Sequence, residues 1–233
     1  MTTSQVRAAI ITGASRGLGL ALAHQLARDG HRLVIDARGI DDLERARADL
    51  AELTNVIAVP GDVSDPDHRR RLVEAADGRL NLLVNNASIL GPSPQPPLAD
   101  YPLDVLEQVY RTNVIAPLGL IQLALPLLRQ SQGTVINITS DAALEPYEGW
   151  GGYGSSKAGL EQMSRILAAE ESLVRVYWVD PGDMNTRMHQ EAYPGDDISD
   201  RPPPEASVPG LMNLINSNRP SGRYAARELV PAQ

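Results

Sequence analysis

Residues 6–19 read VRAAIITGASRGLG and combine three signals in a fixed order. The apolar run 6–12 predicts a buried strand, and Leu18, Leu22 and Leu26 recur at helical spacing beyond the glycines. Glycines permit a tight turn with close backbone approach, and a helix N-terminus offers free N–H groups to a pyrophosphate. We therefore expect this turn to bind a dinucleotide. The alternative is an ordinary glycine-rich turn between a strand and a helix.

The rest of the chain repeats this alternation of strand and helix. Further strands are predicted at 32–36, 56–59, 80–84, 134–139, 175–179 and 222–226, and helices at 41–53, 66–76, 103–112, 114–129 and 153–170, with Asn113 as an interruption. This spacing predicts an α/β fold, a doubly wound parallel sheet (Rossmann fold) in three layers α/β/α. At 233 residues the chain fits a single domain, 1–233.

Composition narrows the classes of protein that fit. Apolar residues make up 42% of the chain, cysteine is absent and the formal charge is −8. The lack of cysteine excludes thiolate catalysis, and the four histidines are scattered without ligand spacing, so we expect no metal site. The negative charge argues against nucleic acid as a partner, and no apolar run approaches the ~20 residues of a membrane span. With no leader-like segment at its beginning, the protein is expected in the cytoplasm.

Tyr153 and Lys157 stand one helical turn apart, so their side chains leave the same face of a helix. A free phenol has a pKa of ~10 and exchanges protons poorly at neutral pH. An ammonium beside it favours the phenolate, so we expect Lys157 to lower the pKa of Tyr153 and fit it for acid–base work. Ser140 follows the apolar run 134–139 and is expected at the carboxyl end of a strand, where ligands gather in open sheets. Taken alone, the Tyr153–Lys157 pair also fits an exposed helix surface.

These features occur in one order along nearly the whole chain. They are the Thr-Gly-x-x-x-Gly-x-Gly turn, Asp62, Asn-Asn-Ala at 85–87, Asn113, Ser140, the Tyr153–Lys157 pair, and Pro181-Gly182 followed by Thr186. Their order and intervals resemble the short-chain dehydrogenase/reductase family. The resemblance implies an NAD(P)-dependent oxidoreductase that interconverts a carbonyl (ketone or aldehyde) and an alcohol in a small-molecule substrate.

The resemblance also implies roles for individual residues. Tyr153 would be the general acid or base, Lys157 would hold the nicotinamide ribose, and Ser140 would hydrogen-bond the substrate oxygen. Asn113 would anchor a water that links Lys157 to solvent. The cofactor would lie against Gly13, Ser15, Arg16, Gly17, Leu18, Gly19, Arg38, Asp62, Val63, Asn86, Ala87, Tyr153, Lys157, Pro181, Gly182 and Thr186.

Two sequence rules disagree on which cofactor is used. Counting about 20 residues beyond the glycine motif reaches Asp36, an acid that would bind a ribose 2′-hydroxyl and select NAD. Comparison of residues 33–38 with the family's pattern shifts the position to Ala37, where no acid repels a 2′-phosphate. Arg38 and Arg16 could each bind the 2′-phosphate through two parallel hydrogen bonds. The alternative is that both are solvated surface residues without a ligand. We expect NADP(H) to be favoured over NAD(H), with Asp36 paired to an arginine or turned away from the ribose.

Three departures from the family's pattern limit what the resemblance implies. Ser88 stands where the family has glycine after Asn-Asn-Ala, and Asp141 follows Ser140 where a small residue is usual. Asp141 is either a surface charge or a substrate contact. The chain after Gly222 lacks the glycine pair that is usual in the family. The resemblance therefore does not determine the last strand or any subunit contact that this strand makes.

Residues from about 184 to 209 are rich in proline and acids, and we expect them to form a mobile substrate-binding lid. The segments 103–129 and 153–170 carry more apolar residues than one buried face needs, so a homodimer or homotetramer is expected.

The sequence leaves the substrate open, although Tyr147, Trp150, Met184, Met188 and Tyr193 are candidates to line an apolar pocket. The alternative function is a dinucleotide-binding regulatory or scaffolding protein without turnover. The complete set of proton-transfer residues favours the enzyme, because a sensor has no need of a proton donor.

Overall fold

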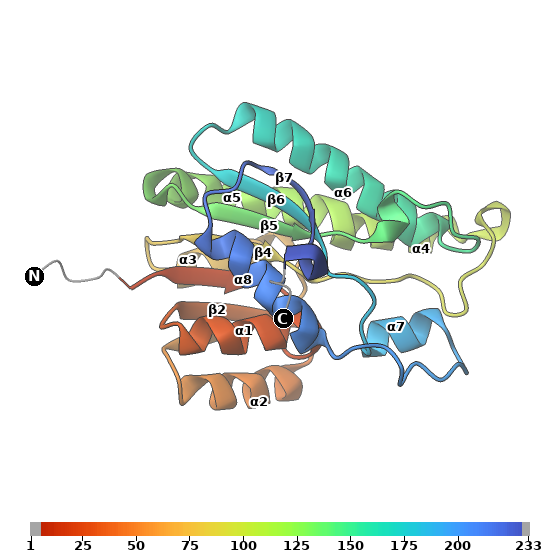
Figure 1. Cartoon of the computed structure of the whole chain (residues 1–233), viewed down its shortest axis with the longest axis horizontal. Coiled ribbons are helices and arrows are strands. Elements are labelled where there is room, and N and C mark those ends of the chain that lie inside the picture. The colour runs from red at the N-terminus through yellow and green to blue at the C-terminus, as the bar shows by residue number, and fades with distance from the viewer. Residues whose placement is uncertain (1–5, 230–233) are drawn as a thin grey trace, which may run out of the picture.

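The predicted strands pair in parallel as one sheet. The structure, a computed structural model, describes residues 6–229. Within them the sheet has seven strands in the order β3-β2-β1-β4-β5-β6-β7 (Figure 1). The strands are β1 (Ala8–Ile11), β2 (Arg32–Ala37), β3 (Val56–Pro60), β4 (Leu82–Asn85), β5 (Thr134–Ile138), β6 (Arg175–Asp180) and β7 (Gly222–Ala225).

Helices cover both faces of this sheet. One layer holds α1 (Gly17–Arg28), α2 (Ile40–Ala51) and α8 (Val208–Asn216), and the other holds α3 (Pro66–Ala75), α4 (Leu103–Tyr110), α5 (Ala116–Ser131) and α6 (Gly151–Glu170) (Figure 1). Side chains of a strand alternate between faces, so Ala9 and Ile11 pack in the first layer's core and Ile10 in the second's. The expected doubly wound, three-layer α/β/α fold is confirmed.

The expected helix break at Asn113 is wrong. A π-helical turn, Arg111–Ile115, joins α4 and α5, so that Leu103–Ser131 runs as one helix of 29 residues. Its most apolar window has a mean hydropathy of 1.3, enough by length and composition alone to cross a membrane, and 44% of that window is buried inside the protein. Leu120, Ile121 and Leu128 pack in the core against the sheet, which accounts for much of the apolar character.

The proline-rich segment after β6 contains a short helix that its composition does not predict. It contains α7 (Arg187–Ala192), which begins at Thr186, whose side chain accepts a hydrogen bond from the His189 N–H. Pro209 lies in the first turn of α8, where its missing N–H costs no helical bond. Shorter 3₁₀ turns occur at Leu98–Asp100, Asp141–Ala143, Pro204–Ser207 and Ala226–Leu229.

The sheet order places a topological switch point at β1. From β1 the chain proceeds outward to β2 and β3, and then returns to β4 on the other side of β1. Loops that leave the carboxyl ends of these strands therefore diverge and open a crevice, the usual ligand site of doubly wound sheets.

Candidate active site

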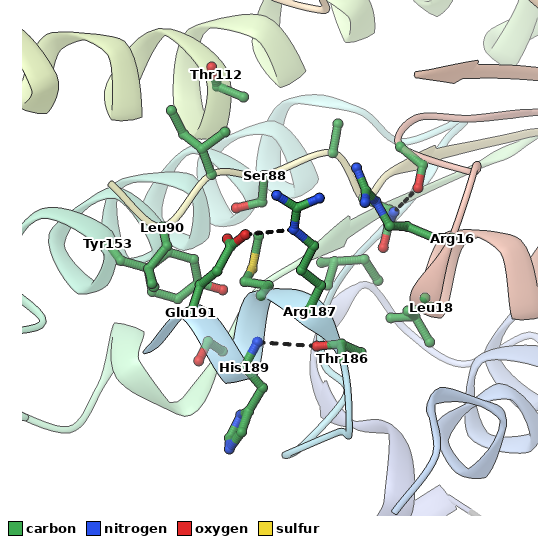
Figure 2. A pocket seen from close by; sticks show the side chains of 18 of the residues that line it. Arg16, Leu18, Ser88, Leu90, Thr112, Tyr153, Thr186, Arg187, His189 and Glu191 are labelled. Carbon is green, nitrogen blue, oxygen red and sulfur yellow. Dashed lines mark hydrogen bonds and ion pairs between the residues drawn. The ribbon is translucent and has the colours of Figure 1, made fainter. Parts of the chain in front are cut away.

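A cavity of about 770 Å³ occupies this crevice. Its walls come from the residues that follow the carboxyl ends of six strands, β1 to β6, and from α7 and the beginning of α6 (Figure 2). Gly19 and Asn113 do not line it. The other predicted site residues do: Gly13, Ser15, Arg16, Gly17, Leu18, Arg38, Asp62, Val63, Asn86, Ala87, Ser140, Tyr153, Lys157, Pro181, Gly182 and Thr186.

The glycine turn is shaped as a cradle. Gly13 and Gly17 have φ values of +66° and +56°, which favour glycine. A Cβ on Gly19 would lie 2.5 Å from the Gly13 carbonyl oxygen and 2.6 Å from Asn86 Nδ2. Gly19 is therefore required for packing, and it lies in the first turn of α1, which begins at Gly17 and has no acidic residue in that turn. The free N–H groups of this terminus suit an anion such as a pyrophosphate.

Thr12 and Asn86 hold the cradle against β4. Thr12 Oγ1 accepts hydrogen bonds from the backbone N–H groups of Asn86 and Ala87, both at 3.0 Å. Asn86 Nδ2 donates to the carbonyl oxygens of Thr12 and Gly13 at 2.9 and 3.1 Å. The Asn86 side chain thus supports the turn, while the residue also borders the cavity.

Asp36 lines the cavity, but both oxygens of its carboxylate are already bonded within the protein. Its Oδ1 accepts from the Gly13 N–H at 2.7 Å, its Oδ2 lies 2.9 Å from His68 Nε2, and the residue is 1% exposed. The expectation of an arginine partner is wrong, because the partner is a buried histidine. Burial raises the pKa of Asp36, and the hydrogen bonds from His68 and Gly13 act in the opposite direction.

Two arginines stand free beside this carboxylate. Arg38 follows β2 and Arg16 precedes α1; both are exposed and line the cavity. Neither forms an ion pair with another residue between 6 and 229. Ala37 lies between Asp36 and Arg38, so the end of β2 offers the cavity a cation and no free carboxylate.

Tyr153 and Lys157 lie on α6 as the spacing predicts, but their electrostatics differ from the expectation. Burial raises the pKa of Tyr153, and the carboxylates of Asp180 and Asp141 raise it further. Lys157 Nζ lies 5.4 Å from the centre of the phenol ring and donates to the Ile138 carbonyl oxygen at 2.8 Å. Burial lowers the pKa of Lys157 to about 7. The predicted lowering of the Tyr153 pKa is therefore wrong for this structure, in which desolvation is the dominant effect.

Ser140 forms one side of the same wall through a short polar network. Its Oγ donates to Asp141 Oδ1 at 2.9 Å, and Asp141 Oδ2 accepts from the Tyr147 hydroxyl at 2.8 Å. Asp141 lines the cavity, so it is more than a remote surface charge. The carboxylate also raises the pKa of Tyr147 to about 12.

Asn113 lies behind the cavity wall, in the π-helical turn. Its Oδ1 accepts from the Ile89 N–H and the Ser88 hydroxyl, and its Nδ2 donates to the Ile89 carbonyl and Ser156 Oγ. The side chain is 1% exposed, and these four contacts join the loop after β4 to α6. The water that Asn113 is expected to anchor between Lys157 and solvent stays a prediction.

The part of the cavity wall made by α7 and the loop after β4 contains residues that the sequence did not single out. Arg187 and Glu191 both line the cavity and form an ion pair at 2.8 Å one turn apart on α7, and Leu90 faces Tyr153 (Figure 2). Their signal in the sequence is weak, because α7 is short and has no apolar periodicity. Of the five candidates for an apolar pocket, Trp150, Met184 and Met188 line the cavity, whereas Tyr147 and Tyr193 pack against Trp150.

The residues present fit a dinucleotide. A Cβ at Gly13 or Gly19 would crowd the cradle, and the α1 terminus offers donors. Two arginines, Arg38 after β2 and Arg16 before α1, line the cavity and pair with no carboxylate in the described part of the chain. Among residues 6–229, no group of three or more His, Cys, Asp or Glu side chains is placed to hold a metal ion.

Comparison with known proteins gives consistent matches. The family model described as short chain dehydrogenase matches residues 7–197. A 3-oxoacyl-acyl-carrier-protein reductase of rhamnolipid biosynthesis from Pseudomonas aeruginosa is 37% identical over 97% of this chain and 86% of its own length. Sepiapterin reductase of Mus musculus is 34% identical over 78% of this chain and 76% of its own. A solved structure from Escherichia coli CFT073 that contains NADPH is 26% identical, with a TM-score of 0.86 over 95% of this chain and 96% of that one.

Proposed function

Because the chain belongs to the short chain dehydrogenase family and is an NAD(P)-dependent oxidoreductase, we propose a specific reaction for it. The protein interconverts an alcohol and a ketone or aldehyde, with NADP(H) as cofactor. The observation that carries the proposal is the position of Ser140, Tyr153 and Lys157 on one wall of a cavity whose other wall is the glycine cradle. A proton donor and a dinucleotide site therefore face one space.

The residues of this wall supply the proton chemistry. Tyr153, with its raised pKa, is a protonated phenol at neutral pH and suits donation to a carbonyl oxygen. Ser140, whose hydroxyl donates to Asp141 in this structure, would turn that bond to the same oxygen as negative charge develops there. Lys157, with a pKa of about 7, exchanges a proton readily near neutral pH and would hold the ribose beside the phenol. When bound, the nicotinamide supplies the hydride, and the protein contributes alignment and the proton.

The preference for NADP(H) rests on the end of β2. Asp36 is occupied by Gly13 and His68, so it is not available to a ribose 2′-hydroxyl. Arg38 and Arg16 have no carboxylate partner among the described residues and would bind a 2′-phosphate through charge-assisted, bidentate bonds. The NADPH in the solved Escherichia coli structure accords with this choice.

The substrate we propose is a small, largely apolar carbonyl compound. Leu90, Trp150, Met184 and Met188 give the space next to Tyr153 an apolar lining. The lid, 184–209, adds acids, which disfavour a polyanionic acyl carrier. We propose that this lid closes over bound substrate, although α7 and the bond from Ser93 Oγ to the Glu191 carbonyl already hold part of it.

A homodimer or homotetramer through α4, α5 and α6 is also proposed. Some of the apolar residues on which the expected interface rested are buried in the chain's own core, among them Leu120, Ile121 and Leu160. Ile115 and Ile166 remain 54% and 48% exposed, and Leu118 and Leu123 are each 37% exposed. These four side chains are the apolar surface that a second copy would cover.

The proposal is tested with a panel of ketones, aldehydes and quinones, each assayed with NADPH and with NADH. We expect reduction of at least one carbonyl class, with a higher kcat/KM for NADPH. A protein that binds NADPH tightly but reduces no member of the panel would instead match the regulatory, non-catalytic alternative.

A further inference from the structure

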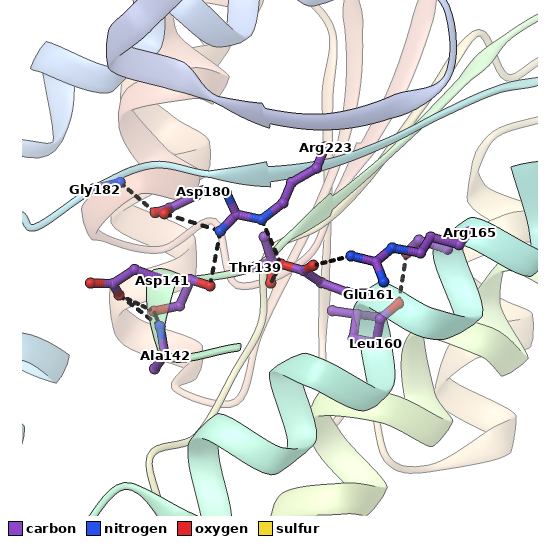
Figure 3. A network of polar contacts seen from close by, with 11 residues as sticks. Thr139, Asp141, Ala142, Leu160, Glu161, Arg165, Asp180, Gly182 and Arg223 are labelled. Atoms are coloured by element: carbon purple, nitrogen blue, oxygen red, sulfur yellow. Dashed lines mark hydrogen bonds and ion pairs between the residues drawn. The ribbon is translucent and has the colours of Figure 1, made fainter. Parts of the chain in front are cut away.

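Arg223 lies on β7, outside the residues that the family model matches. Its guanidinium contacts three groups (Figure 3). Nε donates to Glu161 Oε1 at 3.0 Å, and a terminal nitrogen donates to the Ser140 carbonyl oxygen at 3.3 Å and faces Asp180 Oδ2 at 3.4 Å. The planar fork of arginine suits such simultaneous contacts, which the single ammonium of lysine cannot reproduce.

The three contacts reach the three elements that carry the proposed chemistry. Ser140 ends β5. Glu161 lies on α6, one turn beyond Lys157 and two turns beyond Tyr153. Asp180 ends β6 and also accepts from the Gly182 N–H at 2.9 Å, which fixes the turn on the nicotinamide side.

The anchor on α6 is itself buried. Glu161 is 2% exposed, and its Oε1 also accepts from the Thr139 hydroxyl at 2.9 Å. Arg165 approaches its other oxygen at 3.4 Å from the surface. Removing the principal cation of a buried carboxylate leaves an uncompensated charge and strongly destabilises the fold. The ion pair with Glu161 therefore keeps the Arg223 guanidinium in its position.

We propose that Arg223 is a positioning residue for the reaction, because it joins the ends of β5 and β6 to α6 and so keeps Ser140, Tyr153 and the Gly182 turn in one arrangement. This inference rests on the proposed carbonyl reduction. It assigns to the last strand a part in the active site, although that strand contributes no side chain to the cavity wall.

The same contacts have an electrostatic consequence at Tyr153. The charges that face its phenol are Asp180 from β6, Asp141 from the turn after β5, and Lys157 from its own helix. Both carboxylates raise the pKa of Tyr153. Arg223 offsets the charge of Asp180, so its removal exposes more negative charge to the phenol and disfavours the phenolate further.

The test compares Arg223→Gln and Arg223→Lys with Arg165→Gln, a control that removes a guanidinium from the same glutamate at the surface. Arg223→Gln should lower kcat for carbonyl reduction by about 10- to 100-fold, as expected for a displaced catalytic group. KM and NADPH affinity should change much less. Arg165→Gln should stay near the unmutated rate. Equal rates for Arg223→Gln and the unmutated enzyme, or an equal loss in Arg165→Gln, would overturn the inference.

The pH profile of alcohol oxidation supplies a readout that a loss of stability alone would not move. In Arg223→Gln the limb that reports formation of the phenolate, which lies above the free-phenol pKa of ~10 and is distinct from any limb of Lys157 near 7, should shift to still higher pH. Arg223→Lys keeps the positive charge and should restore this limb while regaining only part of the rate. If Arg223→Gln does not fold, Arg223→Lys provides the test. A rate equal to that of the unmutated enzyme in Arg223→Lys would show that the planar guanidinium is not required.

Failure of the proposed function would be recognised separately. If the unmutated protein reduces no carbonyl, hydrogen exchange still tests the positioning role without turnover. Arg223→Gln should speed exchange in segments 139–142 and 153–161 more than Arg165→Gln does. Unchanged exchange in both segments would reject the inference.

Discussion

Replacing His68 with leucine removes the ring that bonds Asp36 while filling much of its space. The two side chains are 0% and 1% exposed, with 2.9 Å between Nε2 and Oδ2. The other ring nitrogen of His68, Nδ1, lies 3.3 Å from a terminal nitrogen of Arg71, so Nε2 is the ring atom that bonds Asp36. The substitution therefore deletes one hydrogen bond to a buried carboxylate.

The magnitude follows from what Asp36 retains. Its remaining side-chain hydrogen bond comes from the Gly13 N–H at 2.7 Å. A hydrogen bond to a charged group contributes about 1.5–3 kcal/mol, and a buried carboxylate that loses such a bond lies toward the upper end of this range. We expect His68→Leu to lose about 3 kcal/mol of unfolding free energy, or about 6–12 °C in Tm for a chain of this size.

The loss should depend on pH in a defined direction. The folded-state pKa of Asp36 is raised, so its contribution to stability is present below the unfolded pKa and is lost as pH rises through the folded pKa. His68 lowers that folded pKa, and its removal raises it further. The variant should therefore lose most at neutral pH, and the difference from the unmutated protein should shrink as pH falls toward the ordinary aspartate value of 3.8.

Thermal and urea unfolding of both proteins across this pH range measures the effect. Asp36→Asn keeps an oxygen for the Gly13 N–H and removes the charge, so the double variant Asp36→Asn/His68→Leu should be more stable than His68→Leu alone. His24→Leu, at a histidine of α1 outside the pair, is the control. An unchanged Tm in His68→Leu, or a loss that does not vary with pH, would refute the reasoning.

Other substitutions test the remaining proposals. Lys157→Ala should weaken NADPH binding and turnover together, because one ammonium is proposed to serve ribose and phenol; unchanged affinity in a fluorescence titration contradicts the ribose contact. Arg38→Ala should weaken NADPH by about 10- to 100-fold and leave NADH nearly unchanged, whereas an equal loss for both cofactors excludes a 2′-phosphate contact. Sedimentation at micromolar concentration should give a dimer or tetramer that Ile166→Glu dissociates; a monomer for the unmutated chain contradicts the proposed interface.

Local patterns were sufficient to predict the fold and the cavity wall. The glycine turn at 13–19 and the Tyr153–Lys157 pair are short-range features, because spacing along one turn or one helix determines which face they share. Strand and helix alternation then placed both at the carboxyl edge of a parallel sheet, where the cavity lies.

What the sequence did not predict depends on contacts between distant residues. Asp36 and His68 are 32 positions apart, and Arg223 meets Ser140 across 83 positions through the pairing of β7 with β6. The direction of the Tyr153 pKa also escaped prediction, because burial outweighs a neighbouring ammonium that instead bonds the Ile138 carbonyl. Such effects follow from tertiary packing, which no spacing rule reports.

Tyr153→Phe tests the proposed chemistry most directly, because it removes one hydroxyl and leaves an 8% exposed ring in place. The measurement is single-turnover reduction of a carbonyl identified in the panel, followed by nicotinamide absorbance, beside NADPH affinity for the same variant. We predict a rate lower by about 10²- to 10⁴-fold, the usual contribution of a general acid, with affinity nearly intact. A variant that transfers hydride at more than about a tenth of the unmutated rate would show that Tyr153 is not the proton donor.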